Sequence, residues 1–272
     1  MSEIIKIKPK TSWLNLDLKE IWKHRELLYF LTLRDIKLRY KQTFFGVLWA
    51  VLQPVLTTAI FTAIFTNFAR FDSTKVPYPI FALSGILIWL FVNSSITNAS
   101  NSLVGNSNLV TKVYFPRLIV PVSAILAGLI DLLIGLGLLK ILMFYYGISI
   151  TSNILFVPLF LLLSIVLAIA LGVAFAALNV RFRDVKHALP FALQVWMFGS
   201  AIFYPLDIFS ENRRFILSFN PLVGILEGFR SSLFGNVFDW QTIGISTFIT
   251  IILLCVSVCI FKQMEDDFAD LI

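Results

Sequence analysis

The sequence predicts an all-α membrane protein with six transmembrane helices, an N-terminal amphipathic interface helix, and re-entrant external helices between spans 5 and 6. Of its 272 residues, 58% are hydrophobic and only 14% are charged, whereas about a quarter of residues are charged in soluble domains. Four stretches lack Asp, Glu, Lys and Arg, namely Gln42–Ala69, Val76–Thr111, Ile141–Val180 and Trp240–Phe261. Each exceeds the roughly 20 residues that cross a hydrocarbon core about 30 Å thick. A large soluble catalytic domain is therefore excluded.

Three regions are expected along the chain: a cytoplasmic N-terminal segment (1–42), a six-span domain (43–261) and a cytoplasmic tail (262–272). Some forty residues rich in charge precede the first apolar run, so we expect no cleavable signal peptide, and the first span directs insertion. Within residues 13–41, apolar side chains near helical spacing predict an amphipathic helix at the membrane surface: Leu14, Leu18, Ile21, Trp22, Leu28 and Tyr29. The four cations of Arg34–Lys41 fit an anchor on anionic lipid and are compatible with a further role.

The six spans are predicted at Thr43–Asn67, Tyr78–Ser100, Leu118–Tyr146, Ile154–Leu178, Ala188–Tyr204 and Ile243–Phe261. With the N-terminus inside, sixteen Lys and Arg residues outside the spans fall on the inner side and five, including Arg230, on the outer side. The positive-inside rule therefore places both termini in the cytoplasm. The net charge of +6 is explained by this distribution, and no nucleic-acid partner is expected.

The outer segment Pro205–Gln241 contains an apolar stretch, Leu222–Phe234, that is too short for a span. Asn220 and Pro221 are a typical helix start, and Gly235 with Asn236 a typical stop. This pattern predicts a re-entrant or interfacial helix.

Motifs for catalysis are missing from the sequence. There is no G-x-x-x-x-G-K-[ST] phosphate loop and no G-x-S-x-G nucleophile turn. His24 and His187 are single histidines in charged segments, and Cys255 and Cys259 lie in an apolar run where they are expected to pack as small hydrophobic residues. We therefore expect no catalytic residue, metal site or cofactor in this chain. If ATP drives the protein, another subunit binds it.

Asp131 and Lys140 are the ionisable residues expected well inside a span. Nine positions separate them, which places them on opposite faces of one helix, so they are not expected to pair. Lys140 lies near the outer end, where it can extend to the interface. Asp131 has three interpretations: a hydrogen bond to a neighbouring helix, a place in the lining of a polar cavity, or a proton relay.

Aromatic residues are abundant, with 27 Phe, 7 Tyr and 6 Trp. Rings on the first and fifth spans are candidates for a path on which sugars stack: Phe61, Phe65, Trp196, Phe198, Phe203 and Tyr204. For any single Phe, a lipid-facing or core position is the favoured interpretation.

Four strings resemble the ABC-2 type permeases that export polysaccharides. Leu33–Pro54 (LRDIKLRYKQTFFGVLWAVLQP) resembles that family's segment entering the first span, and Lys112–Pro121 (KVYFPRLIVP) and Leu178–Pro190 (LNVRFRDVKHALP) resemble its two cytoplasmic loops. Asn220-Pro221, followed by Glu227-Gly228-Phe229-Arg230, is similar to its re-entrant external segment. The four strings occur in the family's order.

The resemblance implies a homodimer of six-span subunits in a bacterial inner membrane, joined to two copies of an ABC ATPase subunit that binds ATP and Mg. The expected substrate is a lipid-linked (undecaprenyl-linked) polysaccharide such as O-antigen, with teichoic acid or capsular polysaccharide as alternatives. By the same likeness, a coupling helix within Asn101–Arg117 contacts the ATPase, with Phe182, Arg183 and Asp184 as a second contact. The implied coupling residues in the first loop are Asn106, Asn108, Lys112, Tyr114, Phe115 and Arg117. The acidic tail (Glu265, Asp266, Asp267 and Asp270) has no counterpart in that pattern.

Two other classes of function remain open. An ion-coupled secondary transporter would use a membrane carboxylate such as Asp131, and a membrane-embedded transferase would need paired acids or a histidine at one membrane face. The polysaccharide exporter alone explains the cytoplasmic loops together with the missing catalytic groups.

Overall fold

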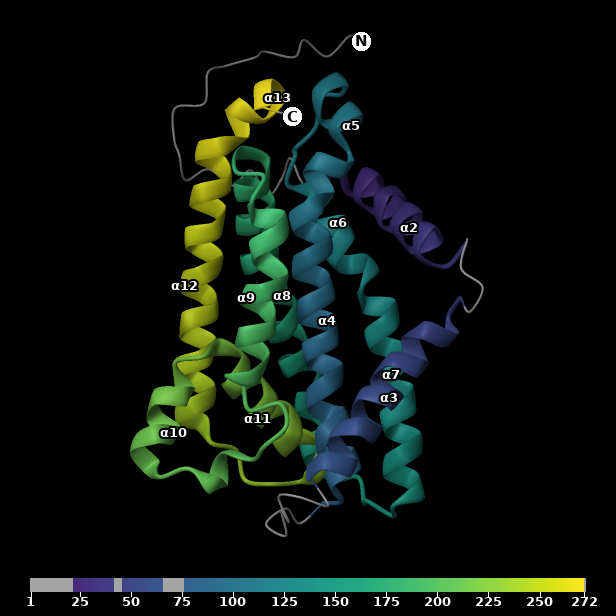
Figure 1. Cartoon of the computed structure of the whole chain (residues 1–272), viewed down its shortest axis with the longest axis vertical. Helices are drawn as coiled ribbons and strands as arrows, with labels where there is room; N and C mark the ends of the chain where they lie inside the picture. Colours follow the sequence, from purple (N-terminus) through teal and green to yellow (C-terminus); the bar gives the residue numbers. More distant parts are fainter. Residues whose placement is uncertain (1–21, 42–45, 66–75, 272) are drawn as a thin grey trace.

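The structure is a computed structural model that describes residues 22–41, 46–65 and 76–271. Regular secondary structure in these residues is helical throughout, with no strand among them. The longer helices run along one axis and pack side by side (Figure 1). The helices are α2 (Arg25–Lys41), α3 (Leu48–Ile64), α4 (Tyr78–Gly105), α5 (Ser107–Lys112), α6 (Ile119–Ala127), α7 (Leu129–Tyr145), α8 (Val157–Arg181), α9 (Val185–Phe198), α10 (Glu211–Ser218), α11 (Pro221–Phe234), α12 (Trp240–Met264) and α13 (Phe268–Leu271). Short 3-10 turns lie at η2 (Ser152–Phe156), η3 (Leu206–Ile208) and η4 (Glu265–Asp267).

Four segments of the described chain are long and apolar enough to cross a membrane: α4, α6 with α7, η2 with α8, and α12 with η4. They coincide with the second, third, fourth and sixth predicted spans. The third is interrupted at Gly128, where the N–H bonds back to the Ile125 carbonyl at 3.0 Å. A Cβ at Gly128 would lie 3.1 Å from the Ser95 hydroxyl oxygen, so this break brings the backbone close to α4.

The first and fifth predicted spans are shorter helices. α3 has 17 residues and α9 has 14, so α9 rises only about 21 Å. The predicted helix to Tyr204 is wrong at its end, because α9 stops at Phe198 and the chain then turns, with Ala201 at a φ of 52°. The number of membrane crossings stays a prediction.

The helix predicted in the outer segment is confirmed in its bounds. The Asn220 side chain accepts a hydrogen bond from the Leu222 N–H at 3.1 Å, and Pro221 occupies the first turn, where its missing N–H costs nothing. Gly235 ends α11 in the left-handed conformation, with a φ of 71°. α11 packs against α12, α8 and α4.

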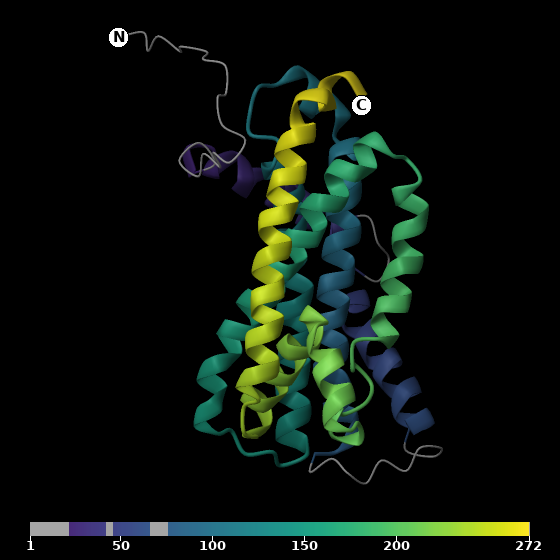
Figure 2. The same ribbon diagram turned by 90° about the vertical axis from the view of Figure 1, so that its left-hand side faces the viewer.

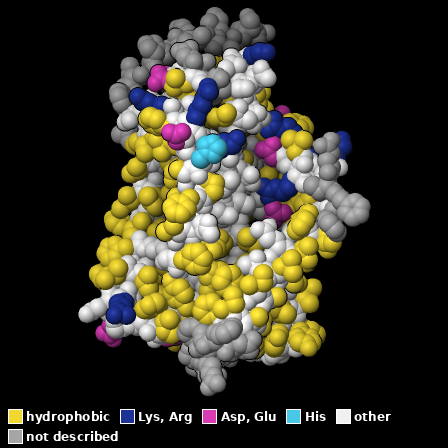
Figure 3. Space-filling model, in the orientation of Figure 1, with side chains coloured by type: hydrophobic (Ala, Val, Ile, Leu, Met, Phe, Trp, Pro, Cys, Tyr) yellow, Lys and Arg dark blue, Asp and Glu magenta, His cyan; other side chains and the backbone are white. Residues whose placement is uncertain are grey.

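The two ends of the bundle differ in composition. We call one the α5 end, where α5, the α8–α9 turn and α13 lie, and the other the α11 end, where α10 and α11 lie (Figures 1 and 2). Charged side chains gather near the α5 end and on α2, while hydrophobic side chains cover much of the rest of that face (Figure 3). The loops to which the positive-inside count assigns Lys112, Arg117, Arg183 and Lys186 lie at the α5 end, and the side of the membrane that this end faces stays a prediction.

The predicted amphipathic helix corresponds in part to α2, which packs against α6. Leu31, which was not in the predicted set, is its buried residue, and Leu28 packs in the same hydrophobic cluster. Trp22 and Tyr29, placed on the same face by the prediction, are 69% and 61% exposed. Leu14, Leu18 and Ile21 lie outside the described residues.

Small residues allow the central helices to approach closely. A Cβ on Gly172 of α8 would lie 2.9 Å from the Ala99 Cβ of α4. About two turns further along α8, the Asn179 side chain donates to the Ser100 carbonyl at 2.9 Å. Close backbone approach with interhelical hydrogen bonds is the mode by which helices associate in lipid. α4 is thereby fixed at the centre of the molecule.

Candidate functional site

A row of polar side chains lies on the half of α4 that leads to the α5 end. Ser94, Asn98 and Asn101 lie four and three positions apart and so share one face, and Asn93 directly precedes Ser94. We call them the polar track. It extends about 12 Å along α4 from Asn93 to Asn101. Within the described residues, the Asn93 and Asn98 side chains make no hydrogen bond, so their amides remain available to a ligand.

Three cavities follow the polar track. The first, of about 260 Å³, is lined by Asn93 and Ser94 together with Trp49 and Gln53 of α3. The second, of about 540 Å³, contains Asn98 and Asn101 and shares Arg39 with the first. The third, of about 500 Å³, shares Asn101 and Gly105 with the second and reaches the cations Arg183 and Lys186 and the ring of His187. White polar side chains and backbone are visible between the hydrophobic areas of this face (Figure 3).

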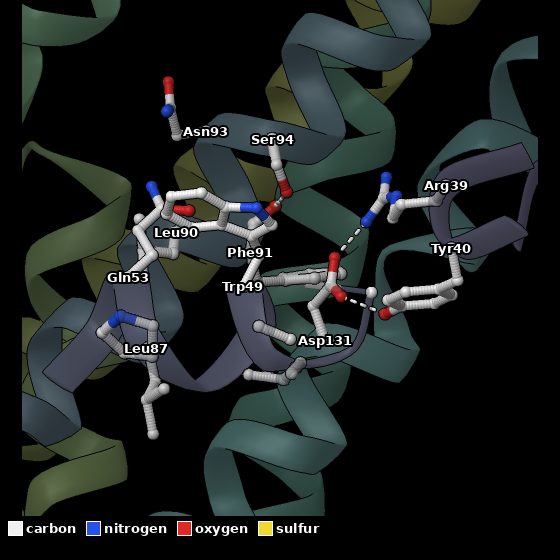
Figure 4. Close-up of a pocket in the computed structure, with 14 residues that line it drawn as sticks. Arg39, Tyr40, Trp49, Gln53, Leu87, Leu90, Phe91, Asn93, Ser94 and Asp131 are labelled. Carbon is white, nitrogen blue, oxygen red and sulfur yellow. Dashed lines mark hydrogen bonds and ion pairs between the residues drawn. The ribbon is translucent and has the colours of Figure 1, made fainter. Parts of the chain in front are cut away.

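Asp131 lies in the wall of the first cavity and is held by α2. Its carboxylate forms an ion pair with Arg39 and accepts a hydrogen bond from the Tyr40 hydroxyl. Figure 4 shows both side chains pointing toward it. Burial, the hydrogen bond to Asp131 and that carboxylate's charge hold the pKa of Tyr40 above its usual range, so the phenol stays a donor. The first two interpretations of Asp131, a bond to a neighbouring helix and a place in a polar cavity, are both confirmed. Lys140 forms no ion pair with it in the described structure.

The aromatic residues assigned to a path divide into two groups. At the α11 end, Phe61 stacks on Phe203 with ring centroids 3.5 Å apart, and Phe65 stacks on Tyr78 at 5.5 Å. The Tyr78 hydroxyl donates to the Phe203 carbonyl at 2.9 Å. Phe203 is only 3% exposed. These rings therefore pack on one another and join α3 to the turn after α9.

The second group surrounds the end of α9. The Trp196 N–H donates to the Asn220 side chain at 3.0 Å, and its ring meets Trp89 edge-on at 5.7 Å. Tyr204 donates from its hydroxyl to the Phe198 carbonyl at 2.9 Å. Phe198 itself is 55% exposed. Phe198 thus presents its ring at the surface, while Trp196 fastens α9 to α11.

Arg230 of the outer segment is buried, at 3% exposed. Its guanidinium donates to the carbonyls of Ala201 and Ile202 at 2.9 and 2.6 Å and lies 3.7 Å from the centroid of the Phe81 ring. The sequence count placed Arg230 among the outer cations. In the structure its guanidinium is buried and donates hydrogen bonds to the carbonyls of the turn after α9, which would otherwise lack partners. Burial raises the pKa of the Glu227 carboxyl, which the charge of Arg230 opposes.

The loop predicted to hold a coupling helix contains α5, with six residues. Asn108, Lys112 and Tyr114 are exposed, Tyr114 at 85%, and Asn106 is half-buried. Phe115 is 6% exposed and packs in the hydrophobic cluster beneath α5, so its ring is withdrawn from the surface. Arg117 donates to the Glu265 carbonyl. Phe182, Arg183 and Asp184 are exposed at the same end. The structure thus brings both predicted contact regions to one end of the molecule.

A family model described as ABC-2 type transporter matches residues 26–234. The chain belongs to the ABC-2 type transporter family. Members are transmembrane permease subunits of ABC exporters. The match spans the polar track, α5 and α11.

Named members of the ABC-2 type transporter family resemble this chain over most of its length. It is 28% identical over 256 residues to the O-antigen export system permease protein RfbA of Myxococcus xanthus, covering 93% of this chain and 97% of the relative. A Klebsiella pneumoniae protein of the same name is 27% identical over 249 residues, covering 91% and 95%. The polysialic acid transport protein KpsM of Escherichia coli is 27% identical over 245 residues, covering 87% and 92%.

Proposed function

We propose that this chain is the permease subunit of an ATP-driven exporter that moves an undecaprenyl-linked polysaccharide such as O-antigen across a bacterial inner membrane. The names of the relatives support a polysaccharide as substrate. Teichoic acid and capsular polysaccharide remain alternatives within the class. The observation that carries the proposal is the polar track, which connects the cavities from the α5 end to the middle of α4.

The chemistry of the polar track suits a glycan. A sugar hydroxyl without a hydrogen-bond partner costs on the order of several kcal/mol in an alkane-like medium. Asn side chains both donate and accept, so Asn93 and Asn98 can bond successive hydroxyls without fixing one register. Trp49 lies in the wall of the same cavity as Asn93 and is 51% exposed, and aromatic rings are surfaces on which sugars stack. A polymer can therefore slide along this surface.

The cavities of one chain are open at the side, so a second copy is needed to enclose a path. A homodimer with the polar tracks facing each other would form one, with the Phe61–Phe203 stack as its closed outer end. Two copies of an ABC ATPase would bind ATP and Mg and act at the α5 end, on the cytoplasmic side with both termini. Phe198, whose ring is exposed, is the path candidate under this arrangement, while Phe61, Phe65, Phe203 and Tyr204 hold its outer end and Trp196 fastens α9 to α11.

An ion-coupled transporter is the alternative from another class. It would require Asp131 to release and take up a proton during each cycle. The ion pair with Arg39 and the bond from Tyr40 favour a fixed carboxylate instead.

The test is genetic and biochemical. Deleting the gene for this chain should remove the polysaccharide from the cell surface while lipid-linked polymer accumulates inside. An ABC ATPase subunit should co-purify with this chain in a 1:1 ratio. Surface polysaccharide that persists without the chain would overturn the proposal.

A further inference from the structure

The C-terminal turn, Glu265–Leu271, packs onto the loop that contains α5. Arg117 donates to the Glu265 carbonyl, and its guanidinium carbon lies 6.0 Å from the centroid of the Phe268 ring. Phe268 is 0% exposed and meets Phe261 of α12 edge-on, with centroids 5.2 Å apart. α13 also packs against α5 and α8. The turn therefore touches the coupling loop on one side and the last long helix on the other.

The loop is held in place by packing and not by the stability of α5 itself. α5 has six residues, and helices this short are not stable alone in water. Its buried side chain, Val110, and Phe115 of the following segment lie in the same cluster as Phe261 and Phe268. The position of α5 thus depends on tertiary packing to which the C-terminal turn contributes.

The turn is itself fixed to α12. Lys262 and Glu265 form an ion pair at 2.7 Å, and Glu265 is 8% exposed. While its side chain is held by Lys262, its carbonyl accepts from Arg117. Asp266 and Asp267 are exposed. Glu265, one of the acidic residues without a counterpart in the family pattern, therefore links α12 to the loop that contains α5.

We propose that the C-terminal turn is a positioning element that joins residues 106–117 to α12, so that the two move as one body. This inference rests on the proposed function, in which an ATPase pushes on α5. A push on Tyr114 or Lys112 is then carried through Arg117 and Phe268 to α12, rather than absorbed by a loose loop. Arg117 and Phe268 are positioning residues and touch no substrate.

The test compares Phe268→Ala and Arg117→Gln with two controls, Phe248→Ala on the exposed face of α12 and Arg213→Gln at the α11 end. The complex with its ATPase is reconstituted in lipid nanodiscs and vesicles. We expect both test variants to insert and dimerise, and Phe268→Ala, which lies outside the implied coupling residues, to bind the ATPase like the wild type. Both should export roughly three- to tenfold less glycan per ATP hydrolysed, the range in which coupling between sites responds to mutation. Phe268→Leu, which keeps the apolar contact, should restore most of the loss, and both controls should match the wild type.

A second measurement separates this inference from the proposed function. Hydrogen exchange should be faster at the α5 amides in both test variants and unchanged in α4. Wild-type exchange at α5 together with wild-type export per ATP would overturn the positioning role. If Phe268→Ala fails to accumulate, Arg117→Gln decides, since Arg117 is half-exposed. A wild-type chain that neither exports glycan nor binds an ATPase would defeat the proposed function, while the exchange result would still decide whether the turn positions α5.

Discussion

The ring of Phe203 stacks on the ring of Phe61 with centroids 3.5 Å apart and planes 14° apart. The two residues lie on α3 and on the turn after α9, so the contact joins segments far apart in the sequence. Tyr78 reinforces it through the hydrogen bond to the Phe203 carbonyl. The first and fifth apolar segments are therefore held together at the α11 end.

Replacing Phe203 with Ala should lower both stability and export. Truncating a buried Phe typically costs about 3–5 kcal/mol, and Phe203 is 3% exposed. Phe198→Ala, at a 55% exposed ring, is the matched control and should leave thermal unfolding in detergent unchanged. Equal melting temperatures for the two variants would contradict the stack as a structural contact.

The aromatic residues show how far sequence reasoning reaches. The sequence predicted Phe61 and Phe203 only as candidates for a sugar path, and in the structure their rings stack on each other. The sequence predicted a helix through Tyr204, but α9 ends at Phe198. Helical spacing therefore does not apply to Phe203, and the sequence could not indicate that its ring stacks on another ring. The turn that follows α9 is held by Arg230, which lies about thirty residues further along the chain.

Asp131→Asn should leave export largely intact. The amide oxygen still accepts from Tyr40, while the titratable proton is removed. Asp131→Leu should destabilise the subunit by roughly 1–3 kcal/mol, because Arg39 and Tyr40 lose their partner. Export assays on vesicles of equal protein content compare the variants. Abolished export by a well-folded Asp131→Asn variant would favour the proton-coupled alternative.

Gly228→Ala should disrupt the packing of α11 against α8. A Cβ at this position would lie 1.9 Å from Phe160, a residue with 0% exposure and no room to move. Overpacking of this kind costs roughly 1–3 kcal/mol or more. Gly244→Ala on α12 is the control, since nothing lies within 4 Å of its added Cβ and alanine favours a helix. The thermal unfolding temperature should fall for the first variant only, and a fall of equal size in both would contradict the packing described.

Topology is tested by labelling single cysteines in a chain whose Cys255 and Cys259 are replaced by Ser. A membrane-impermeant maleimide added to sealed cells should reach a cysteine at Ser210, beside α10, and miss one at Ser107, in α5. Permeabilised cells provide the control, because both positions should then react. Labelling of Ser107 in sealed cells would reverse the assigned orientation.

The sequence was informative about helices and less so about sites. Uncharged runs predicted three of the four long segments, α4, α8 and α12, while α6 and α7 were predicted despite Asp131 and Lys140. Asn220-Pro221 and Gly235 predicted the bounds of α11 because caps are local signals. The sequence did not predict the polar track, because Asn93, Asn98 and Asn101 carry no charge and lie within an apolar, uncharged stretch. Arg230 was placed outside, since its carbonyl partners belong to a turn that only the fold creates.

The central claim is that a glycan passes along the polar track of α4. It is tested most directly with a photo-reactive amino acid at Asn98, in a complex arrested by a hydrolysis-deficient ATPase and supplied with radiolabelled lipid-linked glycan. The same group at Ile251, exposed on α12, is the control. We predict glycan cross-linked at position 98 and not at position 251. Cross-linking at neither position, or at 251 alone, in a complex whose wild-type form exports glycan would contradict the claim.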